Sequence, residues 1–181
     1  EGQPAVSSIF AGGVWVGGRD KAGNIKLAGV TYRSLTDNFD WFPGPLDPAG
    51  QTDEPICKNW DRFFSVDGNA VRNHIAAFDA VPPGGQYSCD SIPVDVLYWP
   101  GQGNPYWNDK YDFELPDQSL GAFWDEDGDG LYDPCKGDFP TIEIRDCEPA
   151  DRNKAKELIP DEMVFWIYND NGGVHRLTAG D

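Results

Sequence analysis

The residues with the most definite chemistry are the carboxylates of one short acidic stretch, Asp125-Glu-Asp-Gly-Asp-Gly-Leu-Tyr-Asp133. Carboxylates at alternate positions converge on a hard cation when the chain folds back on itself. Gly130, at the sixth position, permits the sharp turn that this requires. The sequence therefore predicts a metal site, and its expected ligands are Asp125, Asp127, Asp129, the backbone carbonyl of Leu131, Asp133 and Asp138.

The stretch departs from an EF-hand in its surroundings. Its twelfth position is Lys136 instead of the usual bidentate glutamate, and Pro134 prevents a continuous helix after the loop. No helix is expected before it. We expect Asp138 to supply the missing carboxylate. The arrangement resembles the helix-poor calcium loops of extracellular proteins, such as thrombospondin type 3 repeats and dockerin-like modules.

The donor set selects the ion. Oxygen ligands favour calcium over zinc, and the number of carboxylates favours calcium over magnesium. The predicted cofactor is therefore Ca²⁺, in a structural role, because plentiful extracellular calcium keeps even weak sites filled. The alternative interpretation is a solvated acidic turn.

Enzymatic constellations are weaker. Glycoside hydrolysis needs a paired acid and base, but among 31 acidic residues some pairs arise by chance. The two histidines are His74, expected at the surface of a helix, and His175, which has no evident nucleophile as a partner. The glycine pairs near the start lack the lysine of a phosphate-binding loop. We therefore predict that the protein is not an enzyme.

Clustered aromatic side chains suggest a second possibility, because their rings can stack on sugars. A carbohydrate-binding module or glycan-active enzyme is thus the alternative function, although aromatic residues in a chain rich in glycine and proline more often form a core. The candidates are Trp99, Tyr106, Trp107, Tyr111 and Trp124.

The net charge excludes some partners. With 31 acidic and 14 basic residues the formal charge is −17. Nucleic-acid binding needs a positive surface, and anionic lipid also repels an acidic protein. The longest apolar run, Met163 to Ile167, is too short to span a bilayer. We expect no nucleic-acid partner, no membrane insertion and a mature, processed, secreted chain.

The four cysteines are Cys57, Cys89, Cys135 and Cys147. An even count at irregular spacing favours two disulfides in an oxidising compartment. Three pairings are possible. Cys57–Cys89 and Cys135–Cys147 are preferred because they close the shortest loops, and four free thiols are the alternative.

The elements that must position these residues are mainly β. Short strand-like runs separated by glycine and proline predict a β-sandwich-like fold with long ordered loops and one short helix, in a single module over 1–181. Asp67 is expected to cap the helix. The predicted helix covers 68–78, and a further helical turn is expected at 155–158. The predicted strands are 8–16 and 25–32, which form a hairpin, then 94–99, 141–145, 163–168 and, after a turn at 169–173, 174–178. The segment 35–59 is expected to be a packed loop.

An ordered series of motifs resembles the opening of large secreted surface proteins of Bacteroidota. The series runs through 9–18, 28–33, 41–48, 57–62, 99–101, the acidic stretch, 137–140, 169–170 and His175. Such proteins carry a C-terminal sorting domain for type IX secretion and continue past the point where this sequence ends. The resemblance implies export to the cell surface, no catalytic residues, and a chain that is a fragment or part of a larger assembly.

These expectations combine into one hypothesis. The chain is predicted to be a secreted, calcium-stabilised structural or adhesive component of a bacterial cell surface, appendage or filament. Its expected partners are further copies of itself or other surface proteins, with glycans as the alternative.

Overall fold

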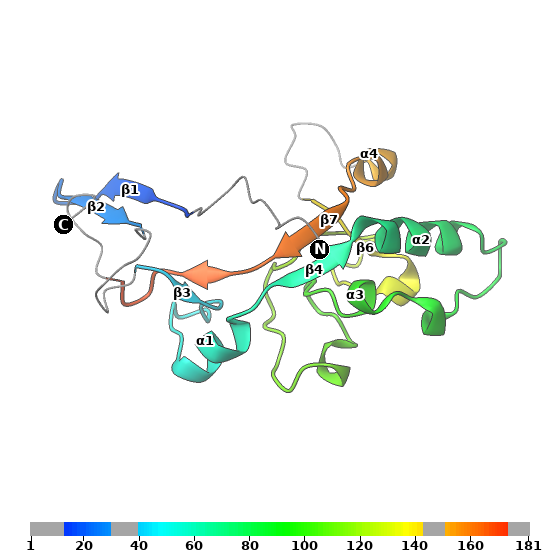
Figure 1. Ribbon diagram of the computed structural model, residues 1–181, viewed down its shortest axis with the longest axis horizontal. Coiled ribbons are helices and arrows are strands. Elements are labelled where there is room, and N and C mark those ends of the chain that lie inside the picture. The colour runs from blue at the N-terminus through cyan, green and yellow to red at the C-terminus, as the bar shows by residue number, and fades with distance from the viewer. Residues whose placement is uncertain (1–12, 30–39, 143–150, 174–181) are drawn as a thin grey trace, which may run out of the picture. The chain divides into compact units, whose positions relative to one another are not determined.

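The computed structural model describes residues 13–29, 40–142 and 151–173. Their contacts group into two compact units, Glu1–Asp61 with Tyr168–Asp181 and Arg62–Ile167. Figure 1 labels most of the helices and strands of both. The single module over 1–181 stays a prediction.

The first unit contains the predicted hairpin. Strand β1 (Val16–Arg19) pairs antiparallel with β2 (Ile25–Ala28). The turn between them is closed by Asp20, whose carboxylate accepts hydrogen bonds from the backbone N–H groups of Ala22 and Asn24 at 2.9 Å. The predicted outer ends, 8–12 and 30–32, lie outside the described residues.

The segment expected to be a loop holds two short elements of the first unit. Strand β3 (Phe42–Pro43) pairs antiparallel with β8 (Tyr168–Asn169), and α1 spans Glu54–Trp60. The helix forms because Asp53 accepts a hydrogen bond from the N–H of Ile56 and a proline stands in its first turn. The predicted return strand at 174–178 lies outside the described residues.

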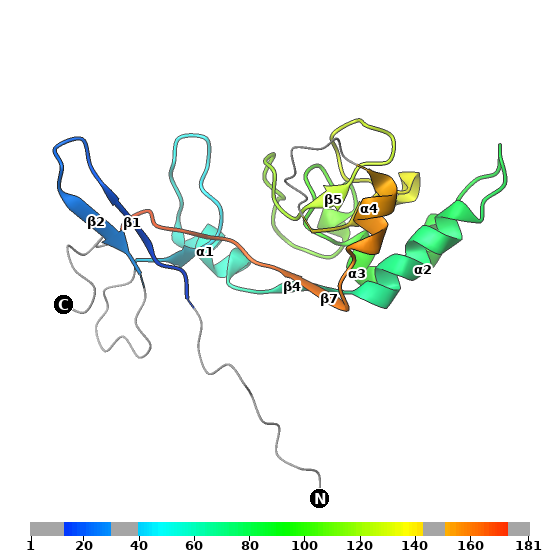
Figure 2. The same ribbon diagram turned by 90° about the horizontal axis from the view of Figure 1, so that it is seen from above.

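The second unit is built on strand β4 (Phe64–Asp67), which pairs antiparallel with β7 (Glu162–Phe165). Helix α2 (Gly68–Asp79) follows β4 directly, and the carboxylate of Asp67 caps it by accepting from two backbone N–H groups. The predicted helix and its cap are thus confirmed. Figure 2 shows α2 continuing from the end of β4.

The predicted strand at 94–99 is wrong. Val94–Leu97 form α3, a single helical turn in which the N–H groups of Val96 and Leu97 bond to the carbonyl of Pro93. Val96 is fully buried. The apolar, β-branched run was misleading because a short buried run has the same composition in either structure.

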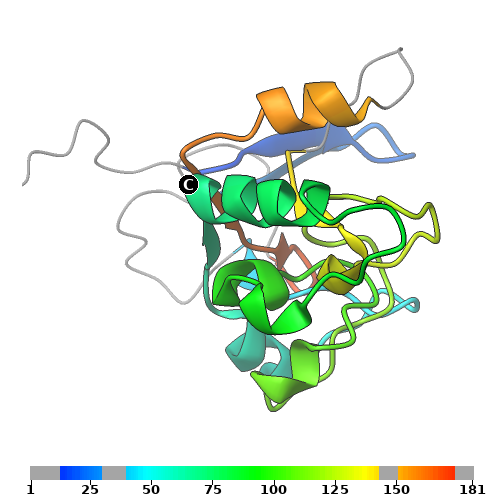
Figure 3. The same ribbon diagram turned by 90° about the vertical axis from the view of Figure 1, so that its right-hand side faces the viewer.

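Three short connections and one further helix complete the second unit. The 3₁₀ turns are Cys89–Ser91, Trp107–Asp109 and Pro134–Lys136. Strand β5 (Phe123–Trp124) pairs with β6 (Phe139–Pro140), which precedes the predicted 141–145 strand, most of which lies outside the described residues. Helix α4 (Arg152–Glu157) confirms helical structure at the predicted turn 155–158, although it begins three residues earlier, and it lies beside α2 in Figure 3.

The fold class is confirmed only in part, and its mainly β character stays a prediction because the sheets are small. Small two-stranded sheets and long ordered loops are present, but the described residues hold four α-helices where one was predicted. Each sheet in the described ranges has two strands, and the sandwich stays a prediction. Among the same residues, no helix has the length and apolar character needed to cross a bilayer.

One continuous core lies in the second unit. It joins β4, α2, α3, β6, α4 and β7, and Tyr132 brings the acidic stretch into it. Tyr132 is fully buried, and its hydroxyl donates to the carbonyl of Val96 at 2.6 Å. The acidic stretch is therefore fastened to the core at one end.

The preferred disulfide pairing is wrong. Cys89 and Cys135 are bonded, with their Cα atoms 5.2 Å apart. Cys57 lies on α1 of the first unit with a free thiol, and Cys147 lies outside the described residues. The shortest-loop argument failed because the packing of the second unit, and not separation along the chain, brings the turns at 89–91 and 134–136 together.

Candidate metal centre

The acidic stretch folds back on itself through its own carboxylates. Asp125 accepts hydrogen bonds from the backbone N–H groups of Gly128 and Gly130, each at 2.7 Å. Both glycines have positive φ, 76° and 82°, a conformation that other residues rarely adopt. The turn predicted at Gly130 is therefore confirmed.

Asp138 is the buried member of the site. Its carboxylate is closed off from solvent and accepts hydrogen bonds from the N–H of Glu126 at 2.8 Å and of Asp133 at 2.7 Å. These two bonds tie together the start and the end of the acidic stretch. Asp138 is thus the residue around which the loop closes.

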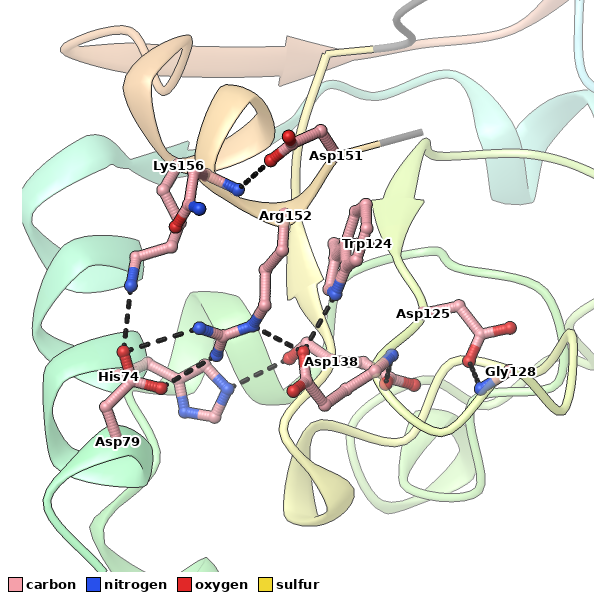
Figure 4. Close-up of polar contacts among 11 residues, drawn as sticks. His74, Asp79, Trp124, Asp125, Gly128, Asp138, Asp151, Arg152 and Lys156 are labelled. Carbon is pink, nitrogen blue, oxygen red and sulfur yellow. Dashed lines mark hydrogen bonds and ion pairs between the residues drawn. The ribbon is translucent and has the colours of Figure 1, made fainter. Parts of the chain in front are cut away.

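His74 of α2 holds the backbone of Asp138. Its Nε2 lies 2.9 Å from the carbonyl oxygen of Asp138 (Figure 4). Its Nδ1 lies 2.9 Å from the hydroxyl of Tyr87. Because a carbonyl can only accept, Nε2 carries the hydrogen and Nδ1 accepts from Tyr87. Burial lowers the pKa of His74, which keeps the ring neutral. The expectation of a surface histidine is wrong.

The site itself is a cluster of three carboxylates. Asp125, Asp127 and Asp138 each place one oxygen so that all three lie within 4.8 Å of one another. Burial, with added repulsion from the other two carboxylates, raises the pKa of Asp138 from 3.8 to about 6, although its two backbone hydrogen bonds act in the opposite direction. The cluster therefore concentrates negative charge around a buried group.

Lys136 compensates part of this charge. Its ammonium lies 3.2 Å from Asp127 and 2.7 Å from Asp129. The hydrogen bond to Lys136 is the main reason that the pKa of Asp129 is lowered. The residue that replaces the glutamate of an EF-hand thus acts as an internal cation for two of the predicted ligands.

The structure brings together three of the six predicted ligands. Asp125, Asp127 and Asp138 form the cluster, whereas Asp129 bonds to Lys136. Asp133 turns its carboxylate to the N–H of Cys135, which it caps at 3.0 Å. Ligation through the carbonyl of Leu131 stays a prediction.

Sequence reasoning missed a charged network beside the site. Arg152 of α4 donates to Glu126 of the acidic stretch and, at 2.8 Å, to Asp79 at the end of α2. Lys156 also donates to Asp79 at 2.8 Å (Figure 4). The Arg152 partners are 26 and 73 residues away along the chain, so no local pattern could have indicated them.

The aromatic candidates for sugar stacking are mostly structural. Trp99 and Trp107 are buried, Trp124 stacks on Phe139, and the hydroxyl of Tyr106 donates to the sulfur of Cys135. Tyr111, which is half-buried, lines a pocket.

The chemistry of the cluster suits cation binding better than catalysis. Three carboxylates offer hard oxygen ligands, and the backbone that surrounds them is held by glycine turns, α2 and the disulfide at Cys135. Comparison with protein-family models, with curated proteins and with solved structures found no match.

Proposed function

We propose that this protein is a secreted structural or adhesive component of a bacterial cell surface, stabilised by calcium bound at Asp125, Asp127 and Asp138. The proposal rests on one observation above all, the burial of the Asp138 carboxylate within 4.8 Å of two other carboxylate oxygens. Carboxylates at such separations repel one another, and a divalent cation among them turns that repulsion into attraction.

A structural role for the ion follows from what the cluster is attached to. Asp138 is held by α2 through His74, and Tyr132 and Cys135 join the same stretch to the core and to Cys89. An ion bound by the cluster would link the exposed acidic stretch to the buried core of the second unit. The site would then act as a staple that is permanently filled where calcium is plentiful.

The extracellular location has separate support. A disulfide is consistent with an oxidising compartment. Export by type IX secretion, the completion of the small sheets into a sandwich by further strands, and self-association in a filament are parts of the proposal that rest on the sequence resemblance. No catalytic activity is proposed.

Thermal unfolding in calcium and in excess chelator tests the metal site. Binding to the folded state at about a hundredfold over Kd adds about 2.7 kcal/mol. For a chain of this size we expect the melting temperature to rise by about 5–10 °C. The rise should disappear in Asp127→Asn, which removes one exposed carboxylate of the cluster.

Asp47→Asn is the matched control. Asp47 also closes a glycine-containing turn, accepting from the N–H groups of Ala49 and Gln51, but it is not part of the cluster. Its variant should keep the full calcium response. Identical melting curves with calcium and chelator would leave the acidic stretch as a solvated turn and remove the basis of the proposal.

A further inference from the structure

A pocket of about 140 Å³ opens in the second unit, between β4, α3 and the turn that follows Trp107. The lining residues used below are Phe63, Asp95, Tyr98, Lys110 and Tyr111. A closed cavity of about 150 Å³ holds benzene, so an open pocket of this size has room for part of one substituted ring. The pocket is separate from the acidic cluster, because it shares no residue with it.

Five of the residues that line the pocket are aromatic, but the surface that they present to it is mostly polar. The side chain of Phe63 is 72% exposed, an unusual state for so large an apolar group. Its ring contacts Trp166, itself 49% exposed, with 5.9 Å between ring centroids. The two rings therefore form an exposed aromatic pair, of which Phe63 lines the pocket.

The polar groups of the pocket have opposite charges and free bonding capacity. The ammonium of Lys110 lies 5.1 Å from the ring centroid of Tyr98 and 5.5 Å from that of Tyr111, which places it between two walls. In the part of the chain that the structure describes, Asp95 makes no hydrogen bond or ion pair. The carboxylate can only accept a hydrogen bond, and the ammonium can only donate one.

A sugar ring combines the properties that these groups require. Each of two neighbouring hydroxyls can donate to a carboxylate and accept from an ammonium. The apolar C–H face of an adjoining ring suits the exposed Phe63–Trp166 pair. The formal charge of −17 disfavours an anionic ligand.

We propose that this pocket binds one neutral pyranose unit of an oligosaccharide, with the Phe63–Trp166 pair under the adjoining unit. Asp95 and Lys110 hold a pair of ring hydroxyls, and Tyr98 and Tyr111 contact the ring. The proposal does not depend on calcium binding at the acidic cluster.

Titration calorimetry with defined hexasaccharides tests it. The probes are cellohexaose, laminarihexaose, mannohexaose and chitohexaose as neutral sugars, and hexagalacturonate as an anionic one, all with calcium present. We expect binding of at least one neutral sugar, and a weaker response to hexagalacturonate. No binding of any neutral probe, or tighter binding of hexagalacturonate, would overturn the proposal.

Three variants locate the site. Asp95→Ala and Lys110→Met each remove one charged hydrogen-bond partner and should weaken binding at least about tenfold. Phe63→Ala should weaken the hexasaccharide more than the corresponding monosaccharide. All three side chains are exposed, so the fold is expected to survive.

Trp15→Ala is the matched control, because Trp15 is an aromatic residue of the first unit with a side chain 50% exposed. It should bind like the unaltered protein. Affinity that is unchanged in Asp95→Ala and Lys110→Met would show that the sugar binds elsewhere and would overturn the proposal.

Discussion

Replacing Asp138 by asparagine separates the charge of this buried side chain from its shape. In the absence of metal, raising its pKa from 3.8 to about 6 corresponds to an ionisation cost of about 3 kcal/mol at neutral pH. Asparagine removes that cost. Its amide group, however, meets the N–H of Glu126 or Asp133 with a donor, and one unsatisfied buried N–H costs about 1–3 kcal/mol.

The two contributions are of similar size and opposite sign. In chelator we therefore expect Asp138→Asn to change the free energy of unfolding by no more than about 2 kcal/mol. In calcium the result should differ. The unaltered protein gains about 2.7 kcal/mol at a hundredfold excess over Kd, and the variant should gain almost nothing, because it has lost the most enclosed of the three carboxylates.

The assay is urea unfolding followed by tryptophan fluorescence, with the disulfide intact, in calcium and in chelator for both proteins. For each protein, the unfolding free energy in calcium minus that in chelator gives the stabilisation by calcium. The difference between the two proteins measures the part that depends on Asp138. A variant that is destabilised equally in both conditions, while its calcium increment stays intact, would refute the reasoning. Asp138 would then be a structural hydrogen-bond acceptor and not a ligand.

Three further predictions concern stability. Cys89→Ser opens a loop of 46 residues and should lower the free energy of unfolding by about 4 kcal/mol in the chain-entropy estimate, measured by urea unfolding against the unaltered protein with and without reductant. Gly68→Ala should lower the free energy of unfolding by at least about 3 kcal/mol, because the new Cβ would lie 1.9 Å from the carbonyl oxygen of Pro160. Gly18→Ala, with nothing within 4 Å of its Cβ, should lower it by less than about 1 kcal/mol. Equal melting temperatures for the two variants would contradict this expectation. Hydrogen bonds from α4 lower the pKa of Asp79 below 3.8, so its ion pairs stabilise the fold above that pH and lose their effect as the pH falls through the lowered value. In that acid range, Asp79→Asn should flatten the curve of unfolding free energy against pH. An unchanged slope would argue against the pairing.

Features that depend on near neighbours were predicted well. The pattern of residue types predicts the cap at Asp67, helix α2, the first hairpin and the glycine turn of the acidic stretch, and the structure contains all four. Their hydrogen bonds join residues no more than a dozen positions apart, so the pattern of residue types contains the required information. Asp138 also joins the cluster as expected, since the loop closes only five residues after Asp133.

Errors occurred where burial decides between local alternatives. The run at 94–97 suits a strand or a helix, and contact with the core selected the helix α3. His74 stands three residues after Val71, on the same helical face, so periodicity alone could have placed it inside. A histidine at a buried position needs a polar partner there, and the carbonyl of Asp138, 64 residues away, is that partner.

The sequence by itself determined the chemistry that is available: oxygen ligands in one turn, oxidisable cysteines and a strongly acidic surface. Tertiary structure decided which of these groups meet. It joined Cys89 to Cys135, turned Asp129 towards Lys136, and gathered Phe63, Asp95 and Lys110 around one pocket. The physical reason is that such contacts depend on how the elements pack around a shared core, whereas turns and caps depend on interactions within a few residues.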